Sequence, residues 1–167
     1  MQTRTRLILI QHVLELSERS NTGRHAASAL SGLELRVFGA KDTPLKVDDF
    51  AGAWLLWPGE PEIPADVPRP STLVVLDGSW SQSRKMLQRV PQLRALRKWS
   101  LAAPPGRRSL RVSPPGGMSS LEAIAEALAV LEGEELGARV RAVHEALVQK
   151  QLGERGYVGP HRTRSSG

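Results

Sequence analysis

Short apolar segments alternate along this chain with amphipathic ones, and this alternation is the feature that most constrains the fold. Leu7-Ile8-Leu9-Ile10 and Leu73-Val74-Val75-Leu76 are continuously apolar, so each predicted strand must be buried on both faces. Strands of this kind, separated by helices, are typical of a parallel sheet with helices on both faces. We therefore predict an α/β fold with strands over residues 6–11, 33–38, 53–57, 72–76 and 99–102.

The helices are predicted from capping residues and apolar periodicity. They are expected over residues 24–30, 81–90, 119–131 and 138–152, with a short helical turn after Pro91. Ser81 is expected to cap the second helix. Ser119 and Glu122 have the spacing of a capping box at the start of the third. Gly133 and Gly137 are expected to interrupt the chain before the last helix.

Length and composition place the chain in a narrow class. Its 167 residues predict a single domain over residues 1–152, followed by a flexible basic tail over 153–167. The absence of cysteine excludes disulfides, a cysteine nucleophile and thiolate metal centres, and we predict no metal site. No apolar stretch approaches the roughly 18 residues of a membrane span, so we expect a cytoplasmic protein with no membrane partner.

Basic residues are concentrated in one block of the sequence. The net charge is +6, and residues 78–121 contain nine basic side chains and no acidic one, whereas residues 42–77 contain seven acidic and two basic side chains. A block of one sign predicts a basic surface for a polyanionic partner. The alternative is a solvated surface that reflects only a high arginine content, since arginine supplies 18 of the 23 basic residues.

Candidate chemistry lies where the predicted strands end, because ligands of parallel sheets bind beyond the carboxyl ends of the strands. Asp77-Gly78-Ser79-Trp80 follows one such strand. A carboxylate there can face the ligand, Gly78 allows close approach, Ser79 supplies a hydroxyl, and Trp80 forms a flat wall or packs in the core. The alternative for Asp77 is a turn or capping residue.

The segment from Leu76 to Met86 resembles the signature of the DTW-domain family, an Asp-x-Thr-Trp motif followed by a helix. Other segments resemble the family in the same order: Gln11-His12 with Glu15 and the following Ser20-Asn21-Thr22-Gly23, Leu56-Trp57-Pro58-Gly59-Glu60, and Ser119-Ser120-Leu121-Glu122-Ala123. Ser79 replaces threonine and Val13 replaces proline, and the N-terminal cysteine cluster of many members is missing. The resemblance therefore indicates a divergent member without the zinc of its relatives.

Several properties are implied by this resemblance alone. It implies a SPOUT-like domain with a knot near the C-terminal half that holds S-adenosylmethionine. It also implies transfer of the 3-amino-3-carboxypropyl group of that cofactor to N3 of a uridine in structured RNA, with tRNA as the expected partner. A SPOUT-type RNA methyltransferase and a non-catalytic RNA-binding module stay open as alternatives, and we expect a monomer.

The resemblance and the strand ends together assign the site residues. Asp77 is the candidate catalytic residue, either as the base for the N3 proton or as the group that orients the uracil or the cofactor. The expected cofactor-binding residues are Leu56, Pro58, Gly59, Gly78, Ser79, Trp80, Leu110, Arg111, Ser119 and Ser120. The expected RNA-binding residues are His12, Arg24, Arg84, Lys85, Arg89, Arg107 and Arg108. We expect Trp54, Trp57 and Trp99 in the core, and the alternative is that one of them stacks on an RNA base. We assign no role to His144.

Overall fold

Five strands form one parallel sheet in the computed structural model of the chain, which describes residues 1–18, 22–58, 66–101 and 118–154. Their order across the sheet is β2-β1-β4-β3-β5. The strands are β1 (Gln2–His12), β2 (Ser31–Phe38), β3 (Trp54–Leu56), β4 (Thr72–Asp77) and β5 (Arg97–Trp99). Every pairing is parallel, so the predicted α/β class with a parallel sheet is confirmed.

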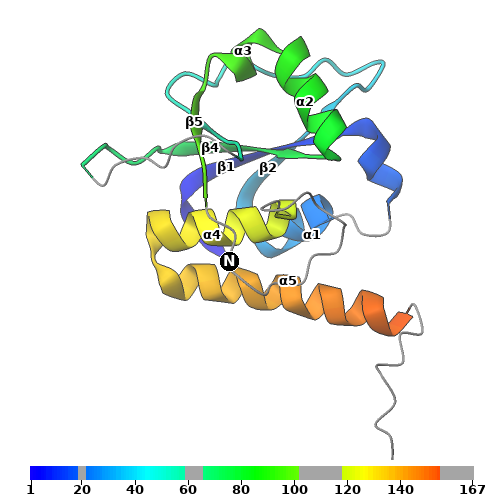
Figure 1. Cartoon of the computed structure of the whole chain (residues 1–167), viewed down its shortest axis with the longest axis vertical. Coiled ribbons are helices and arrows are strands. Elements are labelled where there is room, and N and C mark those ends of the chain that lie inside the picture. The colour runs from blue at the N-terminus through cyan, green and yellow to red at the C-terminus, as the bar shows by residue number, and fades with distance from the viewer. Residues whose placement is uncertain (19–21, 59–65, 102–117, 155–167) are drawn as a thin grey trace, which may run out of the picture.

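Helices cover both faces of this sheet, as predicted (Figure 1). Two of them, α2 (Trp80–Arg89) and α3 (Pro91–Arg94), lie on one face, shown above the sheet. On the other face lie α1 (Thr22–Ala29) and α4 (Ser120–Glu132), and α5 (Glu134–Glu154) packs outside α4. A short 3-10 helix, η1 (Val13–Ser17), follows β1. The implied knot depends on the path of residues 102–117, which lie outside the described residues.

The core has two parts because the central strands are buried on both sides. Leu7 and Leu9 of β1 belong to the core between the sheet and the helices α1 and α4. Ile8 and Ile10 belong to the core between the sheet and the helices α2 and α3. All four side chains are fully buried. Burying each of them stabilises the fold by roughly 1.5–3 kcal/mol. The continuous apolar run in the sequence is thus the direct consequence of two covering layers.

The prediction that Ser81 caps α2 was wrong, because a better cap lies two residues earlier. The Ser79 hydroxyl accepts a hydrogen bond from the Gln82 backbone N–H at 3.2 Å, and the Gln82 side chain accepts one from the Ser79 N–H at 2.7 Å. This reciprocal pair satisfies two N–H groups at the helix start. The predicted box of Ser119 and Glu122 at the start of α4 is confirmed.

Other boundaries also differ from the prediction, since β1 begins at Gln2 instead of residue 6 and α1 at Thr22 instead of residue 24. The last strand covers Arg97–Trp99, not residues 99–102, because its residues pair with the three residues of β3. Gly133 ends α4 with a positive φ, as predicted, but α5 begins at Glu134 and contains Gly137. A Cβ at Gly137 would lie 2.5 Å from that of Ala129, so the glycine allows α5 to approach α4 closely instead of ending a helix.

Charged side chains fix the sheet to its surroundings at two places. The Glu132 carboxylate, at the end of α4, accepts hydrogen bonds from the backbone N–H groups of Arg4 and Thr5 in β1 at 2.9 and 2.6 Å. On the outer strand β2, the guanidinium of Arg36 donates two hydrogen bonds to Asp49, at 2.8 and 2.7 Å.

Within the described ranges, no helix is long and apolar enough to cross a membrane.

Candidate functional site

The candidate site lies between the carboxyl ends of β1 and β4. These neighbouring strands lead to opposite faces of the sheet, since the chain passes from β1 to α1 below the sheet and from β4 to α2 above it (Figure 1). Open parallel sheets bind their ligands at strand ends that diverge in this way. Asp77 and Gln11 are paired residues at the last positions of this ladder.

Asp77 is a buried carboxylate with both oxygens engaged. The residue is only 3% exposed. Oδ2 accepts a hydrogen bond from the Gln11 amide at 2.6 Å, and Oδ1 accepts one from the Ser120 hydroxyl at 2.5 Å. The site therefore joins β4 to both β1 and α4.

The start of α1 approaches the same carboxylate. A Cβ at Gly23 would lie 2.6 Å from Asp77 Oδ2 and 2.8 Å from the Gln11 amide nitrogen. Only a residue without a side chain fits in this position while the hydrogen bond is kept. The first turn of α1 thus lies directly against the Asp77–Gln11 pair.

A second buried polar cluster supports the start of α4. The Ser119 N–H donates to the Glu122 carboxylate at 2.8 Å, and the Ser119 hydroxyl lies 3.2 Å from Nε2 of His144 on α5. Glu122 and His144 are 3% and 1% exposed. The cluster links α5 to the helix start that presents Ser120 to Asp77.

Two indole rings form the apolar side of the site. The Trp80 ring stacks on the ring of Trp57, which follows β3, with 5.1 Å between ring centroids and 27° between planes. Trp80 is 43% exposed, so it does not pack in the core. Trp57 is half-buried and packs against the core on the side of α2 and α3, so its predicted core position is confirmed in part. The core positions of Trp54 and Trp99 are confirmed.

The remaining predicted cofactor residues are divided between the described and undescribed parts of the chain. Leu56 and Gly78 are half-buried at the ends of β3 and β4, and Pro58 and Ser79 are exposed beside them. The structure thus brings these residues to one edge of the sheet, together with Ser119 and Ser120. Gly59, Leu110 and Arg111 lie outside the described residues.

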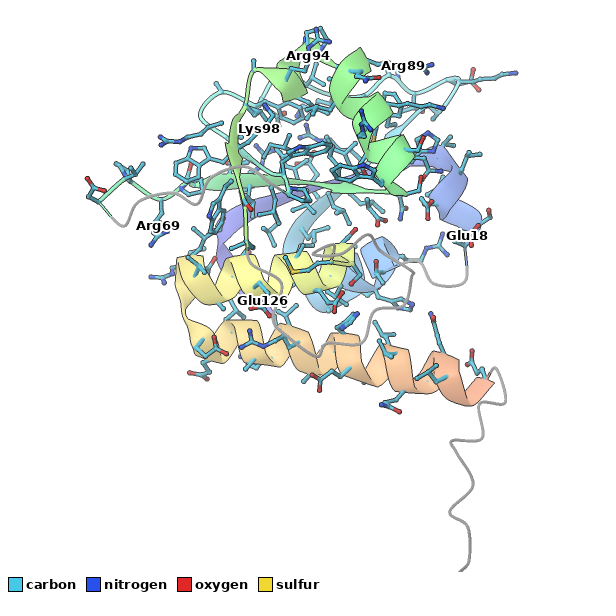
Figure 2. All side chains as sticks on the ribbon, viewed as in Figure 1. Glu18, Arg69, Arg89, Arg94, Lys98 and Glu126 are labelled. Carbon is cyan, nitrogen blue, oxygen red and sulfur yellow. The ribbon has the colours of Figure 1, made fainter. Side chains whose placement is uncertain are left out.

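The predicted RNA-binding residues are only partly gathered on one surface. Arg84, Lys85 and Arg89 are exposed on α2, and Figure 2 shows Arg89 together with Arg94 on the side of the sheet away from Glu126. Arg24 is exposed on α1, which covers the opposite face. Arg107 and Arg108 lie outside the described residues.

His12 ends β1 at the same edge as Asp77. It is half-buried, and its Nδ1 accepts a hydrogen bond from the Leu14 backbone N–H at 3.3 Å, which caps η1. In the described part of the chain, no group of three or more histidine, aspartate or glutamate side chains could hold a metal ion.

Two residues of the site were given no role in the sequence analysis. Gln11 carries a signal, since it is a polar residue at the end of an otherwise apolar strand. His144 carries a weaker one, since it lies between Val140 and Val148 at four-residue spacing, on the buried face of α5.

The comparison with protein families shows to which family the chain belongs. The model of the DTW domain matches residues 1–152. The chain belongs to the DTW domain family. Comparison with curated proteins and with solved structures gave no match.

The structure gives physical reasons for the aspartate and the hydroxyl residue of the DTW motif in this chain. Asp77 joins β4 to β1 and to α4 through Gln11 and Ser120, and Ser79 caps α2 with its hydroxyl. Threonine, the residue of the DTW motif at this position, also caps helices through its hydroxyl, so the replacement by Ser79 keeps the cap. Trp80 begins the helix and presents its ring at the molecular surface.

Proposed function

We propose that this DTW-domain protein transfers the 3-amino-3-carboxypropyl group of S-adenosylmethionine to N3 of a uridine in structured RNA, with tRNA as the expected substrate. The observation that carries the proposal is the position of the DTW motif. Its aspartate lies at the point where β1 and β4 diverge, the place at which a parallel sheet binds ligands. Membership of the DTW domain family supports the proposal, since aminocarboxypropyl transfer is the activity that the resemblance to this family implies.

The reaction places defined demands on the protein. A bond forms between uridine N3 and the γ-carbon of the donor, the bond between that carbon and sulfur breaks, and its electron pair stays on sulfur in methylthioadenosine. The N3 proton is lost to a base or to solvent. The site must hold N3 in line with the γ-carbon instead of the methyl carbon, which is a matter of positioning.

The contacts of Asp77 favour an orienting role over that of a general base. A base must reach the proton that it removes, whereas the Asp77 side chain is buried and already accepts hydrogen bonds at both oxygens. In this role Asp77 fixes the ends of β1 and β4 and the start of α4 relative to one another.

The donor set beside Asp77 suits an amino acid group. The backbone N–H groups of Ser120 and Leu121 begin α4 and make no hydrogen bond within the described residues. A helix start of this kind favours a carboxylate. The N–H of Ser119 is already bound to Glu122, so Ser119 contributes by capping α4.

The proposal is tested by mass spectrometry of nucleosides from unmodified tRNA incubated with the protein and S-adenosylmethionine. We expect aminocarboxypropyl uridine and methylthioadenosine from the unaltered protein. Asp77→Asn is expected to lower the rate at least about tenfold, since misplacing reacting groups is costly. Asp48→Asn, at an exposed aspartate, is the matched control and keeps full activity.

Two other results would overturn the proposal. A methylated nucleoside with adenosylhomocysteine would assign methyl transfer to the same site. RNA binding without any new nucleoside, across tRNA from several sources, would assign a non-catalytic RNA-binding module.

A further inference from the structure

The indole pair of Trp57 and Trp80, which forms the apolar side of the candidate site, is half-buried at Trp57 and exposed at Trp80. Trp80 is 43% exposed, although an indole is among the side chains that gain most from burial. Its ring stacks on that of Trp57 at the carboxyl edge of the sheet.

The indole pair is held rigidly by the backbone on both sides. Trp80 is the first residue of α2, directly after the Ser79 cap with its two hydrogen bonds. The Trp57 N–H donates to the carbonyl of Trp99 at 2.9 Å. A rigid aromatic surface loses little conformational entropy when a planar group stacks on it.

Positive charge borders this aromatic surface. Arg84 lies one helical turn after Trp80, so the two side chains share a face of α2. Lys85 and Arg89 lie on the neighbouring face, also one turn apart, and all three cations are exposed. None of the three is in an ion pair among the described residues, and α2 and α3 contain no acidic residue. Stacking rings beside free cations are typical of surfaces that bind unpaired nucleic acid.

We propose that the Trp57–Trp80 pair is a stacking surface for a base of an unpaired RNA segment, with Arg84, Lys85 and Arg89 contacting its phosphates. This inference rests on the RNA partner of the proposed function and defines the substrate further, as a loop or single strand instead of a continuous duplex. A duplex keeps the faces of its bases covered, so only an unstacked base offers a face to Trp80.

The test measures binding without S-adenosylmethionine, so its outcome does not depend on the transfer reaction. A single-stranded oligouridine and an RNA duplex of equal length are titrated against the unaltered protein, Trp80→Ala and Trp80→Phe over a range of salt concentrations. Val130→Ala, at an exposed apolar residue of α4 on the opposite face, is the control. Thermal unfolding of each variant confirms that it is folded.

We expect the single strand to bind more tightly than the duplex and to quench tryptophan fluorescence. Trp80→Ala should weaken single-strand binding by about 5- to 150-fold, the range measured for loss of one stacked base, with an unchanged salt slope. Trp80→Phe should keep most of the affinity, because the ring face is retained. Arg84→Ala combined with Lys85→Ala should instead reduce the salt slope, because phosphate contacts release counterions.

Three results would overturn the inference. They are equal binding by Trp80→Ala and the control, preference for the duplex, and no binding of either RNA by the unaltered protein. The proposed function is tested separately by nucleoside mass spectrometry, since a protein can transfer the aminocarboxypropyl group to a substrate that does not stack on Trp80.

Discussion

The Asp77 carboxylate depends on donors from two separate layers of the protein. Gln11 reaches it from β1 within the sheet, and Ser120 reaches it from the first turn of α4. Both contacts are buried. Each donor therefore contributes to stability as well as to the shape of the site.

Replacing Ser120 with alanine tests this dependence. The variant leaves one oxygen of a buried carboxylate without its hydroxyl donor, which typically costs about 1–3 kcal/mol of unfolding free energy. The measurement is urea denaturation followed by circular dichroism. Ser81→Ala, at an exposed serine of α2, should change stability by less than about 0.5 kcal/mol. Equal stability of the two variants would show that the Ser120 hydroxyl does not stabilise Asp77.

At this scale the sequence predicts some residues of the site and misses others for a physical reason. Asp77 was found because it directly follows an apolar strand, and Ser119 because it has a local capping pattern with Glu122. The same pattern of Ser79 and Gln82 was missed, since Ser81 was taken as the cap of α2. The contact of Gln11 with Asp77 spans 66 residues, and that of Ser119 with His144 spans 25. Such contacts are created by tertiary packing. The local sequence shows that Gln11 and His144 are polar residues at apolar positions, but it does not show which residue each of them contacts.

The two C-terminal helices pack closely at one glycine. A Cβ at Gly137 of α5 would lie 2.5 Å from the Cβ of Ala129 and 2.9 Å from the carbonyl oxygen of Ala125 on α4. Helix propensity alone favours alanine over glycine by about 1 kcal/mol, but this overlap forces the helices apart. We expect Gly137→Ala to destabilise the protein by about 1–3 kcal/mol.

Gly153 provides a matched control in the same helix. A Cβ there would meet nothing within 4 Å, so Gly153→Ala should leave stability unchanged or raise it by up to about 1 kcal/mol. Thermal and urea unfolding of both variants provide the comparison. Stabilisation by Gly137→Ala as well would mean that α4 and α5 do not approach as described.

Helix and strand boundaries were predictable to the extent that they depend on local chemistry. The reciprocal hydrogen bonds of a capping box are set within four residues, so the start of α4 was predicted correctly. Gly137 has the same sequence signature as a helix-ending glycine, and only its contact with Ala129 identifies it as a packing residue. β5 was misplaced because its limits are set by pairing with β3, a partner 43 residues away.

Across the whole molecule, buried or bridging carboxylates join the layers and respond to acid. Hydrogen bonds from Arg36 and then Arg6 hold the pKa of Asp49 well below its usual range. Burial alone would raise the pKa of Glu132, but hydrogen bonds from the backbone N–H groups of Arg4 and Thr5 outweigh this effect and lower it. Both carboxylates therefore bind protons less readily in the folded chain than in the unfolded chain.

This difference fixes the sign of the pH dependence. The stabilisation by Glu132 is complete above the unfolded pKa of about 4.3 and is lost as the pH falls through the lower folded value. We expect urea midpoints to be nearly constant from neutral pH to about pH 5 and to fall at lower pH. Glu132→Gln should be less stable at neutral pH and should lose less stability on acidification. Glu145→Gln, at an exposed residue of α5, should follow the unaltered protein, and the same acid response in both variants would contradict a role for Glu132 in joining α4 to β1.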